Sequence, residues 1–458
     1  MKSFVKLPCT ATLTADYRNG SLTPTDVAER CIDAFNTHES SVHAWECFDS
    51  QRLMDQARQA TQLIRSGAMP RALEALPVGV KDIFNTADFP TQMGSPLWKG
   101  FTPGNDARVL YDIKRHGAIV PGKTVTAEFA VHSLGKTLNP HAFDRTPGTS
   151  SSGSAVAVAT GMVPVALGTQ TAGSIIRPAS FCGVWGCKPS FGLVPRTGTL
   201  KTTDSLDSVG FFVNHAADLF PVFEAVRVHG KNFPISDAAL SNTARQAAPL
   251  DRPWRVAVVK PHVWEYVPDY ANDAFSAWCA KLAANPRFEV VYATLPARMA
   301  NAHNVHETIY NKSLAYYFKE EFKRAELISP VMNRLITAGQ SISVSQYEAA
   351  LEEQVALARL MDKFFTGETE VSAHKIDYDV MLTLSTACEA PFRSVEEAPD
   401  SALMWTLTHL PAVSAPVFSS SDGLPYGLQV VARRYNDPLL FRFIAEAERL
   451  ELLKATNH

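Results

Sequence analysis

The chain has 458 residues, of which 46% are hydrophobic and 19% charged, a composition typical of a globular protein with a large core. Its net charge of −3 gives neither the broad basic field that nucleic acid requires nor a strongly acidic one. We therefore expect a small-molecule partner and no binding of nucleic acid.

The seven cysteines are odd in number and scattered along the chain, and none lies in a CxxC or Cys/His cluster. This spacing predicts reduced thiols rather than disulfides or a zinc site. The N-terminal residues lack the long apolar core of a signal peptide, and the most apolar stretch, residues 155–168, is too short to span a bilayer. We therefore expect a cytoplasmic protein without a membrane segment.

The first predicted helix begins near Thr23. Thr23 can cap it, Pro24 suits its first turn, and Asp26 places a carboxylate at the positive end of the helix dipole. The elements expected next are a polar helix, a strand, an amphipathic helix and a short strand, at residues 50–66, 76–84, 106–115 and 118–120.

The remainder of the chain continues the alternation of helices and strands. Residues 155–168 indicate a buried helix followed by a buried strand, and residues 216–363 are mainly helical. Further strands and a closing helix are expected at 255–259, 288–292, 379–384, 411–417, 428–432 and 437–453. This order predicts an α/β fold, with a mixed, largely parallel central sheet sandwiched by helices. Without a repeat or a clear linker, residues 1–458 are expected to form a single domain.

Lys81 is the single lysine of an apolar, strand-like run, LPVGVKDIF. Such a lysine either reaches the surface at the strand end or is desolvated. Desolvation disfavours the charged form and lowers the pKa of the amine, which a lysine that acts as a base requires.

Two further segments consist mainly of small residues. Residues 146–154, TPGTSSSGS, open onto an Ala/Val helix and allow an unusual backbone path, or they form a flexible loop with a serine cap. Residues 167–179, LGTQTAGSIIRPA, run from a strand into a tight turn. The backbone N–H groups of that turn could bind an oxyanion beside Ser174, or the turn is an ordinary strand-to-helix connection.

Taken together, Lys81, Ser150 and Ser174 resemble the three catalytic segments of the amidase signature family, PxxxKD, PGGSSGGS and GTDTGGSIRxPA, in the same order and at similar spacing. The segments GAIVPGKT, LPAVSAP and GLPYGLQ resemble further parts of that family. The resemblance covers about residues 10–210 and 375–450. It implies one amidase signature domain, with a divergent, mainly helical insert at about 216–375 that shapes the substrate pocket.

The resemblance also implies a mechanism. Ser174 attacks the amide carbon, and Ser150 relays its proton to neutral Lys81, so that an acyl-enzyme forms and is then hydrolysed by water. The oxyanion hole is assigned to four successive residues, Thr171, Ala172, Gly173 and Ser174. The family acts on amides, ureas and carbamates, no metal or organic cofactor is needed, and a homodimer is weakly implied.

The sequence departs from the family pattern around both serines. Thr149 and Ser152 replace glycines, and the bond before the relay serine, which is cis in family structures, would here join Thr149 to Ser150. Ala172 also replaces a glycine, which is tolerated if its φ stays negative. Gln170 and Ile176 stand where the family has Asp and Arg, so an expected ion pair is lost without leaving either charge unpaired, and Arg177 follows one place later. Because all three proposed catalytic side chains are present, we expect an active enzyme.

The substrate pocket is the least specified part of the sequence. Met93, Phe129 and Val131 are predicted as pocket walls and Gln170 as a substrate-binding residue, because they lie in or next to the segments that carry the resemblance. The abundance of Phe and Tyr favours an apolar or aryl acyl group.

Four other functions compete with an independent amidase. Residues 117–124 match the phosphate-loop pattern GxxxxGK[ST], although a helix rather than a strand is expected before Gly117, residues 118–120 are expected to form a strand within the loop, and Pro121 removes a backbone donor. A Ser-His-Asp hydrolase could use His132, His141 or His409, but no GxSxG elbow is present. The chain could also be the amidase subunit of an amidotransferase that supplies ammonia to a partner, or a non-catalytic scaffold.

Overall fold

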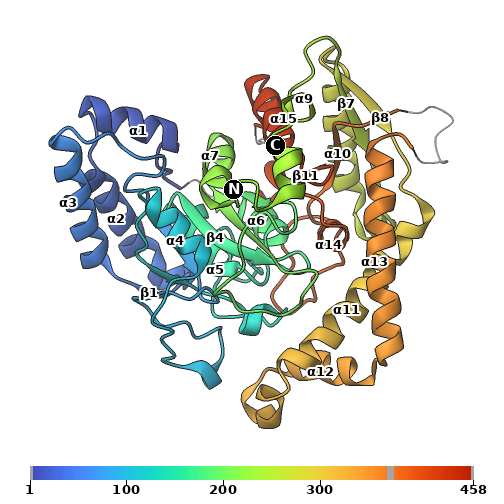
Figure 1. Ribbon diagram of the computed structural model, residues 1–458, viewed down its shortest axis with the longest axis horizontal. Coiled ribbons are helices and arrows are strands. Elements are labelled where there is room, and N and C mark those ends of the chain that lie inside the picture. The colour runs from blue at the N-terminus through green and yellow to red at the C-terminus, as the bar shows by residue number, and fades with distance from the viewer. Residues whose placement is uncertain (1–3, 369–375, 455–458) are drawn as a thin grey trace.

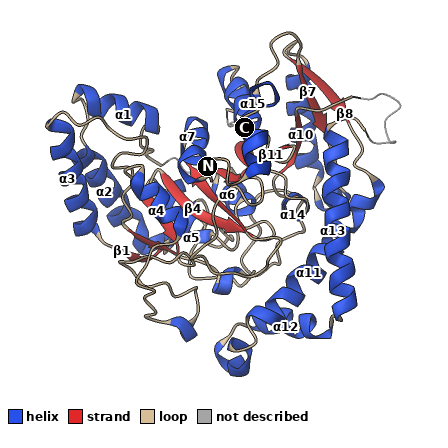
Figure 2. Ribbon diagram, in the orientation of Figure 1, coloured by secondary structure: helices blue, strands red, loops and turns tan. Residues whose placement is uncertain are grey.

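The computed structural model describes residues 4–368 and 376–454. Its centre is an 11-stranded mixed sheet in the order β1-β3-β2-β4-β6-β5-β10-β11-β9-β7-β8, covered by helices (Figure 2). The strands are β1 Trp45–Phe48, β2 Val78–Lys81, β3 Gly122–Thr124, β4 Val165–Gln170, β5 Trp185–Lys188, β6 Ser208–Val213, β7 Trp254–Val258, β8 Phe288–Tyr292, β9 Val380–Leu384, β10 Ala412–Ser419 and β11 Pro425–Ala432.

The helices of the first half lie mostly around the part of the sheet that holds β1 and β4 (Figure 1), although α6 (Ile176–Cys182) packs against β5, β10 and β11. They are α1 Thr10–Asn19, α2 Pro24–Val42, α3 Ser50–Arg65, α4 Arg108–Arg115, α5 Ser152–Ala159, α6 Ile176–Cys182 and α7 Leu219–Val226. Those of the second half are α8 Pro234–Leu240, α9 Thr243–Gln246, α10 Asp269–Ala283, α11 Ala302–Tyr317, α12 Pro330–Ser341, α13 Val344–Phe365, α14 Ala402–Leu407 and α15 Asp437–Arg449.

The prediction of a mixed sheet is confirmed, but the sheet is less parallel than expected. Of the ten strand pairings in the described residues, six are antiparallel and four parallel. The parallel pairs involve β2 with its two neighbours and β7 with its two neighbours. The short turn between β10 and β11 allows only an antiparallel return, because a parallel pair needs a long crossover connection.

Most predicted elements lie where the pattern placed them. Thr23 caps α2 with a full capping box that includes Asp26, and β8 has the predicted bounds. The strand expected at 118–120 is wrong: Ile119 makes only an isolated bridge to Pro77, and the strand is β3, whose Lys123 and Thr124 pair with β2. Pro121 separates the two, since it has no backbone N–H to donate. Helix α1 and strands β1, β5 and β6 are additional elements.

The described part of the predicted insert, residues 216–368, is mainly helical, as expected, but its two strands β7 and β8 extend the central sheet. Residues 369–375 of the insert lie outside the described residues. Helices α11, α12 and α13 extend away from the sheet in Figure 1, and α11 packs against both α12 and α13. The assignment of residues 1–458 to one domain stays a prediction. No helix in the described ranges is both long and apolar enough to cross a bilayer.

Candidate active site

Lys81 is the last residue of β2 and is completely buried. Its amine lies within hydrogen-bonding distance of three hydroxyl oxygens, those of Ser150 (2.8 Å), Ser151 (3.0 Å) and Thr169 (2.9 Å). Lys81 forms no ion pair with any described residue. Burial lowers the pKa of Lys81 well below its ordinary value, and the charge of Asp207 opposes this shift only in part.

The loop before α5 brings Ser150 and Ser151 to this amine. The Thr149–Ser150 peptide bond is cis, as the resemblance implied, and the Ser150 carbonyl accepts a hydrogen bond from the backbone N–H of Ala127 at 3.0 Å. Gly148 has φ +84°, and a Cβ there would lie 2.7 Å from Pro178 Cα. The loop is therefore wedged against the first turn of α6, beside the segment that carries Ser174.

Ser174 lies in the tight turn between β4 and α6 and is 4% exposed. Two carbonyl groups of this turn accept hydrogen bonds from side chains of α11 and α14: Thr171 O accepts from His306 Nε2 at 2.8 Å, and Ala172 O from Thr406 Oγ1 at 2.7 Å. Burial lowers the pKa of His306 to about 4, so its neutral ring serves as the donor. The backbone N–H groups of residues 171–174 donate no hydrogen bond to any described residue. Four donors in a row are thus left available, and Ala172 stays outside the left-handed region.

Gln170 is completely buried and organises the same turn. Its Oε1 accepts hydrogen bonds from the backbone N–H groups of Ile175 (2.9 Å) and Ile176 (3.0 Å), and its Nε2 donates to Thr406 Oγ1 at 2.9 Å. The amide therefore satisfies the first N–H groups of α6, which a helix otherwise leaves without a partner. Both the oxygen and the nitrogen of the Gln170 side-chain amide are hydrogen-bonded within the protein. Its contact with substrate stays a prediction.

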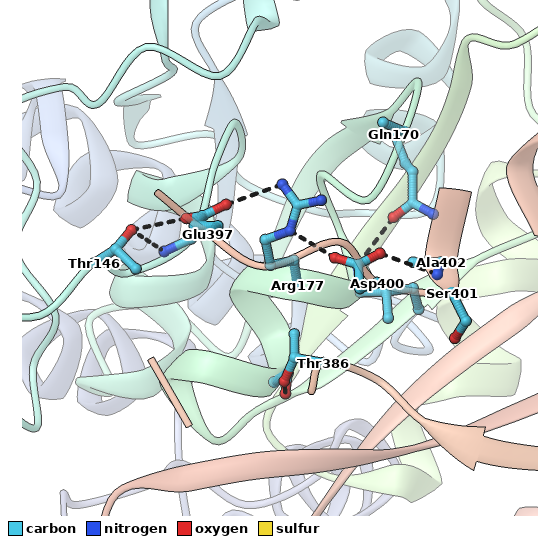
Figure 3. A network of polar contacts seen from close by, with 12 residues as sticks. Thr146, Gln170, Arg177, Thr386, Glu397, Asp400, Ser401 and Ala402 are labelled. Carbon is cyan, nitrogen blue, oxygen red and sulfur yellow. Dashed lines mark hydrogen bonds and ion pairs between the residues drawn. The ribbon is translucent and has the colours of Figure 1, made fainter. Parts of the chain in front are cut away.

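Arg177 makes a different ion pair from the one lost at positions 170 and 176. Figure 3 shows its guanidinium between Asp400, which accepts from Nε at 2.7 Å, and Glu397, which accepts from Nη1 at 3.0 Å. A Cβ at Gly173 would lie 3.0 Å from Arg177 Nη2 and 3.3 Å from both Asp400 carboxylate oxygens. The ion pair therefore packs directly against the turn, and a side chain at position 173 would crowd it. Burial lowers the pKa of Arg177, but the two carboxylates outweigh it and raise the pKa further above its ordinary value.

A cavity of about 230 Å³ adjoins the turn, with Thr169, Thr171, Asp207 and Ala130 among its lining residues. The predicted pocket walls Met93, Phe129 and Val131 are not among the residues that line this cavity, but two of them lie next to one that does. Phe129 and Val131 are completely buried on either side of Ala130, and the Met93 carbonyl accepts from the Phe129 N–H at 2.8 Å. Their part in substrate binding stays a prediction.

The rival sites are not assembled. Lys123, of the phosphate-loop pattern, is completely buried and pairs with Asp82 at 3.0 Å, and no helix begins at Thr124. His141 and His409 use Nε2 for the carbonyl groups of Cys182 (3.0 Å) and Ser205 (2.7 Å). In the described part of the chain, no histidine is hydrogen-bonded to Ser150 or Ser174, and no group of three or more His, Cys, Asp or Glu side chains could hold a metal ion.

The motifs mark Lys81 and Ser150, whose side chains lie 2.8 Å apart, and Ser174 in the turn between β4 and α6, but they do not indicate several of the neighbouring residues. Ser151 and Thr169 flank the motifs, so their position next to Ser150 and Gln170 is a signal that could have been used. The other contacts come from distant segments that have no recognisable pattern: Asp207, His306, Glu397, Asp400 and Thr406.

Known proteins share both the sequence pattern and the fold. The Amidase family model matches residues 26–441. A glutamyl-tRNA(Gln) amidotransferase subunit from Chloroflexus aggregans is 29% identical over 465 residues, covering 92% of this chain and 92% of that protein. The corresponding subunit from Picosynechococcus sp. is 28% identical, covering 88% and 90%. The native peptide amidase of Stenotrophomonas maltophilia superposes with a TM-score of 0.81 at 23% identity, covering 98% of this chain and 97% of that one.

The match over residues 26–441, in a chain that has the fold of a known amidase, shows that this protein belongs to the amidase family defined by the amidase signature.

Proposed function

We propose that this protein hydrolyses a C–N amide bond of a small linear amide, urea or carbamate, with Ser174 as nucleophile and Ser150 and neutral Lys81 as proton relay. The observation that carries the proposal is the environment of Lys81, a completely buried amine that faces three hydroxyl groups and no carboxylate. A charged ammonium group is costly to bury without a counter-charge, whereas a neutral amine is not.

The hydrogen bonds around Lys81 fit a neutral amine, which has two N–H donors and one lone pair. Ser151 donates its proton to Thr169 O at 3.1 Å, so its oxygen can only accept from Lys81. If Thr169 Oγ1 accepts the second N–H, the lone pair of Lys81 faces the Ser150 hydroxyl at 2.8 Å. Ser150 is then the one neighbour whose proton Lys81 can take.

The reaction follows from this arrangement. When Ser174 Oγ forms a bond to the amide carbon, its proton passes to Ser150 Oγ, and the proton of Ser150 passes to Lys81 Nζ. The π electron pair of the carbonyl moves onto its oxygen, which the free N–H groups of residues 171–174 stabilise. Lys81 returns the proton through Ser150 to the leaving nitrogen as the C–N bond breaks. Water then releases the acyl group by the same route in reverse.

A panel of small amides, ureas and carbamates tests this function, with ammonia or amine release as readout. Wild-type protein should turn over at least one compound, and Ser174→Ala and Lys81→Met should both lose that activity. A fluorophosphonate gives a second readout that does not require the substrate, because it should label Ser174 with loss of fluoride. Turnover that is absent in Ser174→Ala but intact in Lys81→Met contradicts the lysine relay, and an unlabelled wild-type protein contradicts the nucleophile.

A second candidate function is that of the amidase component in an amidotransferase complex. The observation in its favour is that the relatives from Chloroflexus aggregans and Picosynechococcus sp., each covering 88% or more of this chain, are subunits of glutamyl-tRNA(Gln) amidotransferases. In that case a stoichiometric partner protein should co-purify, and amide hydrolysis should require it. Efficient turnover by the isolated chain contradicts this candidate. A non-catalytic scaffold is disfavoured because a scaffold has no need for a buried lysine without a counter-charge.

A further inference from the structure

Asp207 is a buried carboxylate next to the candidate active site that the proposed relay does not use. It directly precedes Ser208, which lies opposite Gln170 in the β4–β6 pairing, and it is 7% exposed. It forms no ion pair with any described residue, although a buried carboxylate normally requires a cation.

Hydrogen bonds take the place of a cation at Asp207. Its Oδ1 accepts from three hydroxyl groups, those of Thr171 (2.8 Å), Thr202 (2.6 Å) and Thr203 (2.9 Å). Its Oδ2 accepts from the backbone N–H groups of Thr202 (2.8 Å) and Thr203 (3.1 Å). Five donors hold the carboxylate in place, and Thr171 ties it to the turn that carries Ser174.

Asp207 and the amine of Lys81 are connected through one wall of the cavity. Thr169, which is 2.9 Å from Lys81 Nζ, lines the 230 Å³ cavity together with Thr171 and Asp207. The other charged groups near Lys81 are already matched, since Asp82 pairs with Lys123 at 3.0 Å. Near Asp207, Arg196 donates to the main-chain carbonyl of Asp207 at 3.3 Å and not to its carboxylate. Tyr310 is a neutral phenol, because burial raises its pKa. Among the described residues, Asp207 is the charged group that raises the pKa of Lys81 against the effect of burial.

We propose that Asp207 is a positioning residue that supplies the counter-charge for Lys81 during the interval in which Lys81 holds the proton taken from Ser174. The inference rests on the proposed function. Burial alone would make Lys81 an amine that stays neutral and accepts a proton poorly. A fixed negative charge, placed in the wall of the adjoining cavity rather than in contact with the amine, lets the amine be neutral at rest and still stabilises its protonated form during turnover.

The rate at which a fluorophosphonate labels Ser174, measured between pH 5 and 10, tests the inference without a known substrate. The rate of the wild-type protein should fall on the acid side as Lys81 becomes protonated. In Asp207→Asn the midpoint of this fall should move to lower pH by about one unit, and the plateau rate should drop about tenfold, because the protonated amine has lost its counter-charge. A role confined to holding the turn would lower the plateau and leave the midpoint unchanged, which would overturn the inference.

Two further variants keep the test decisive. Asp218→Asn removes another buried carboxylate, which accepts the Thr10 N–H at 2.7 Å and does not line the cavity, and it should leave the midpoint in place. If Asp207→Asn does not fold, Thr203→Val retains the carboxylate but withdraws one of its hydroxyl donors. The less screened charge should then move the midpoint to higher pH by a few tenths of a unit, on the order of one lost hydrogen bond. An unchanged midpoint in that variant overturns the inference, whereas an unlabelled wild-type protein overturns the proposed function itself.

Discussion

Two buried lysines on neighbouring strands differ in the partners of their amines. Lys81 ends β2 and Lys123 lies on β3, and both are completely buried. Lys123 Nζ binds Asp82 at 3.0 Å, Thr91 Oγ1 at 2.8 Å and two backbone carbonyl groups, while Lys81 faces only hydroxyl groups. Burial lowers the pKa of both amines, but in Lys123 a carboxylate in direct contact counteracts it.

Under the proposed mechanism, burial alone is not enough to make a lysine act as a base. A carboxylate in contact turns a buried lysine into half of a structural ion pair, which ties β3 to the loop after β2. Hydroxyl groups in the same place leave the amine free to exchange a proton. Variants of either lysine test this distinction, because the other lysine serves as the reference.

The largest expected effect is the loss of catalysis in Lys81→Met. Methionine has a similar length and no proton to exchange, so we expect the hydrolysis rate to fall by about 10⁴-fold or more, as is typical when a member of a catalytic relay is removed. At a pH above the ordinary lysine value of 10.5, where this side chain is neutral in the unfolded chain as well, the substitution removes no charge, and the free energy of unfolding should change by no more than about 1–2 kcal/mol. Rate measurements and urea unfolding of the same preparation separate the two effects. A destabilised protein with an unchanged specific activity would refute the assignment.

The opposite outcome is expected for Lys123→Met. Removing one partner of a buried ion pair leaves Asp82 uncompensated, which should lower the free energy of unfolding by about 3–5 kcal/mol. The molecules that remain folded should keep most of their activity, because Lys123 does not contact Ser150 or Ser174.

The double variant Lys123→Met/Asp82→Leu is the matched control. It replaces the pair with apolar side chains of similar volume, so most of the lost stability should return. If the double variant is less stable than Lys123→Met alone, the ion pair is not the origin of the effect.

Much of the fold and the centre of the site could be predicted from the sequence, for identifiable reasons. Thr23 and Asp26 mark the start of α2 because a capping box is local, and β8 is visible as a short run of β-branched and aromatic residues. Lys81, Ser150 and Ser174 stand out because their motifs occur in a recognisable order.

The rest depends on contacts between segments distant in sequence. Asp400 and Glu397 bind Arg177 across more than 200 residues, and Thr406 binds Gln170 across 236. Nothing in the local sequence of such residues distinguishes them from ordinary surface or core residues. The strand expected at 118–120 shows the same limit, since pairing with β2 rather than local hydrophobicity determines where β3 lies.

A smaller effect is expected in the pH dependence of stability. The pKa of Lys81 lies well below 10.5 in the folded protein, whereas the unfolded chain keeps the ordinary value. Between those two values the unfolded state binds one more proton, so this lysine makes the free energy of unfolding rise with pH, by up to about 1.4 kcal/mol per pH unit. Lys81→Met should lack this contribution, and Lys123 is present in both proteins, so the difference between their unfolding curves reports Lys81. Parallel pH profiles would show that Lys81 is charged in the fold.

The smallest effects come from removing one hydroxyl partner of each lysine. Ser151→Ala removes an acceptor for Lys81 and should lower the rate of Ser174 labelling by about tenfold, because the amine is less firmly oriented toward Ser150. Thr91→Val removes the corresponding partner of Lys123 and should leave that rate unchanged. Each hydroxyl also donates to a main-chain carbonyl, that of Thr169 for Ser151 and that of Phe84 for Thr91. Both variants should therefore be destabilised by about 1–2 kcal/mol for each hydrogen bond lost, as urea unfolding would measure. If the two variants lose similar stability but only Ser151→Ala labels more slowly, the slower labelling comes from a misoriented Lys81 amine and not from a general loosening of the core. Equal labelling rates would mean that the hydroxyl groups around Lys81 serve only to fill space.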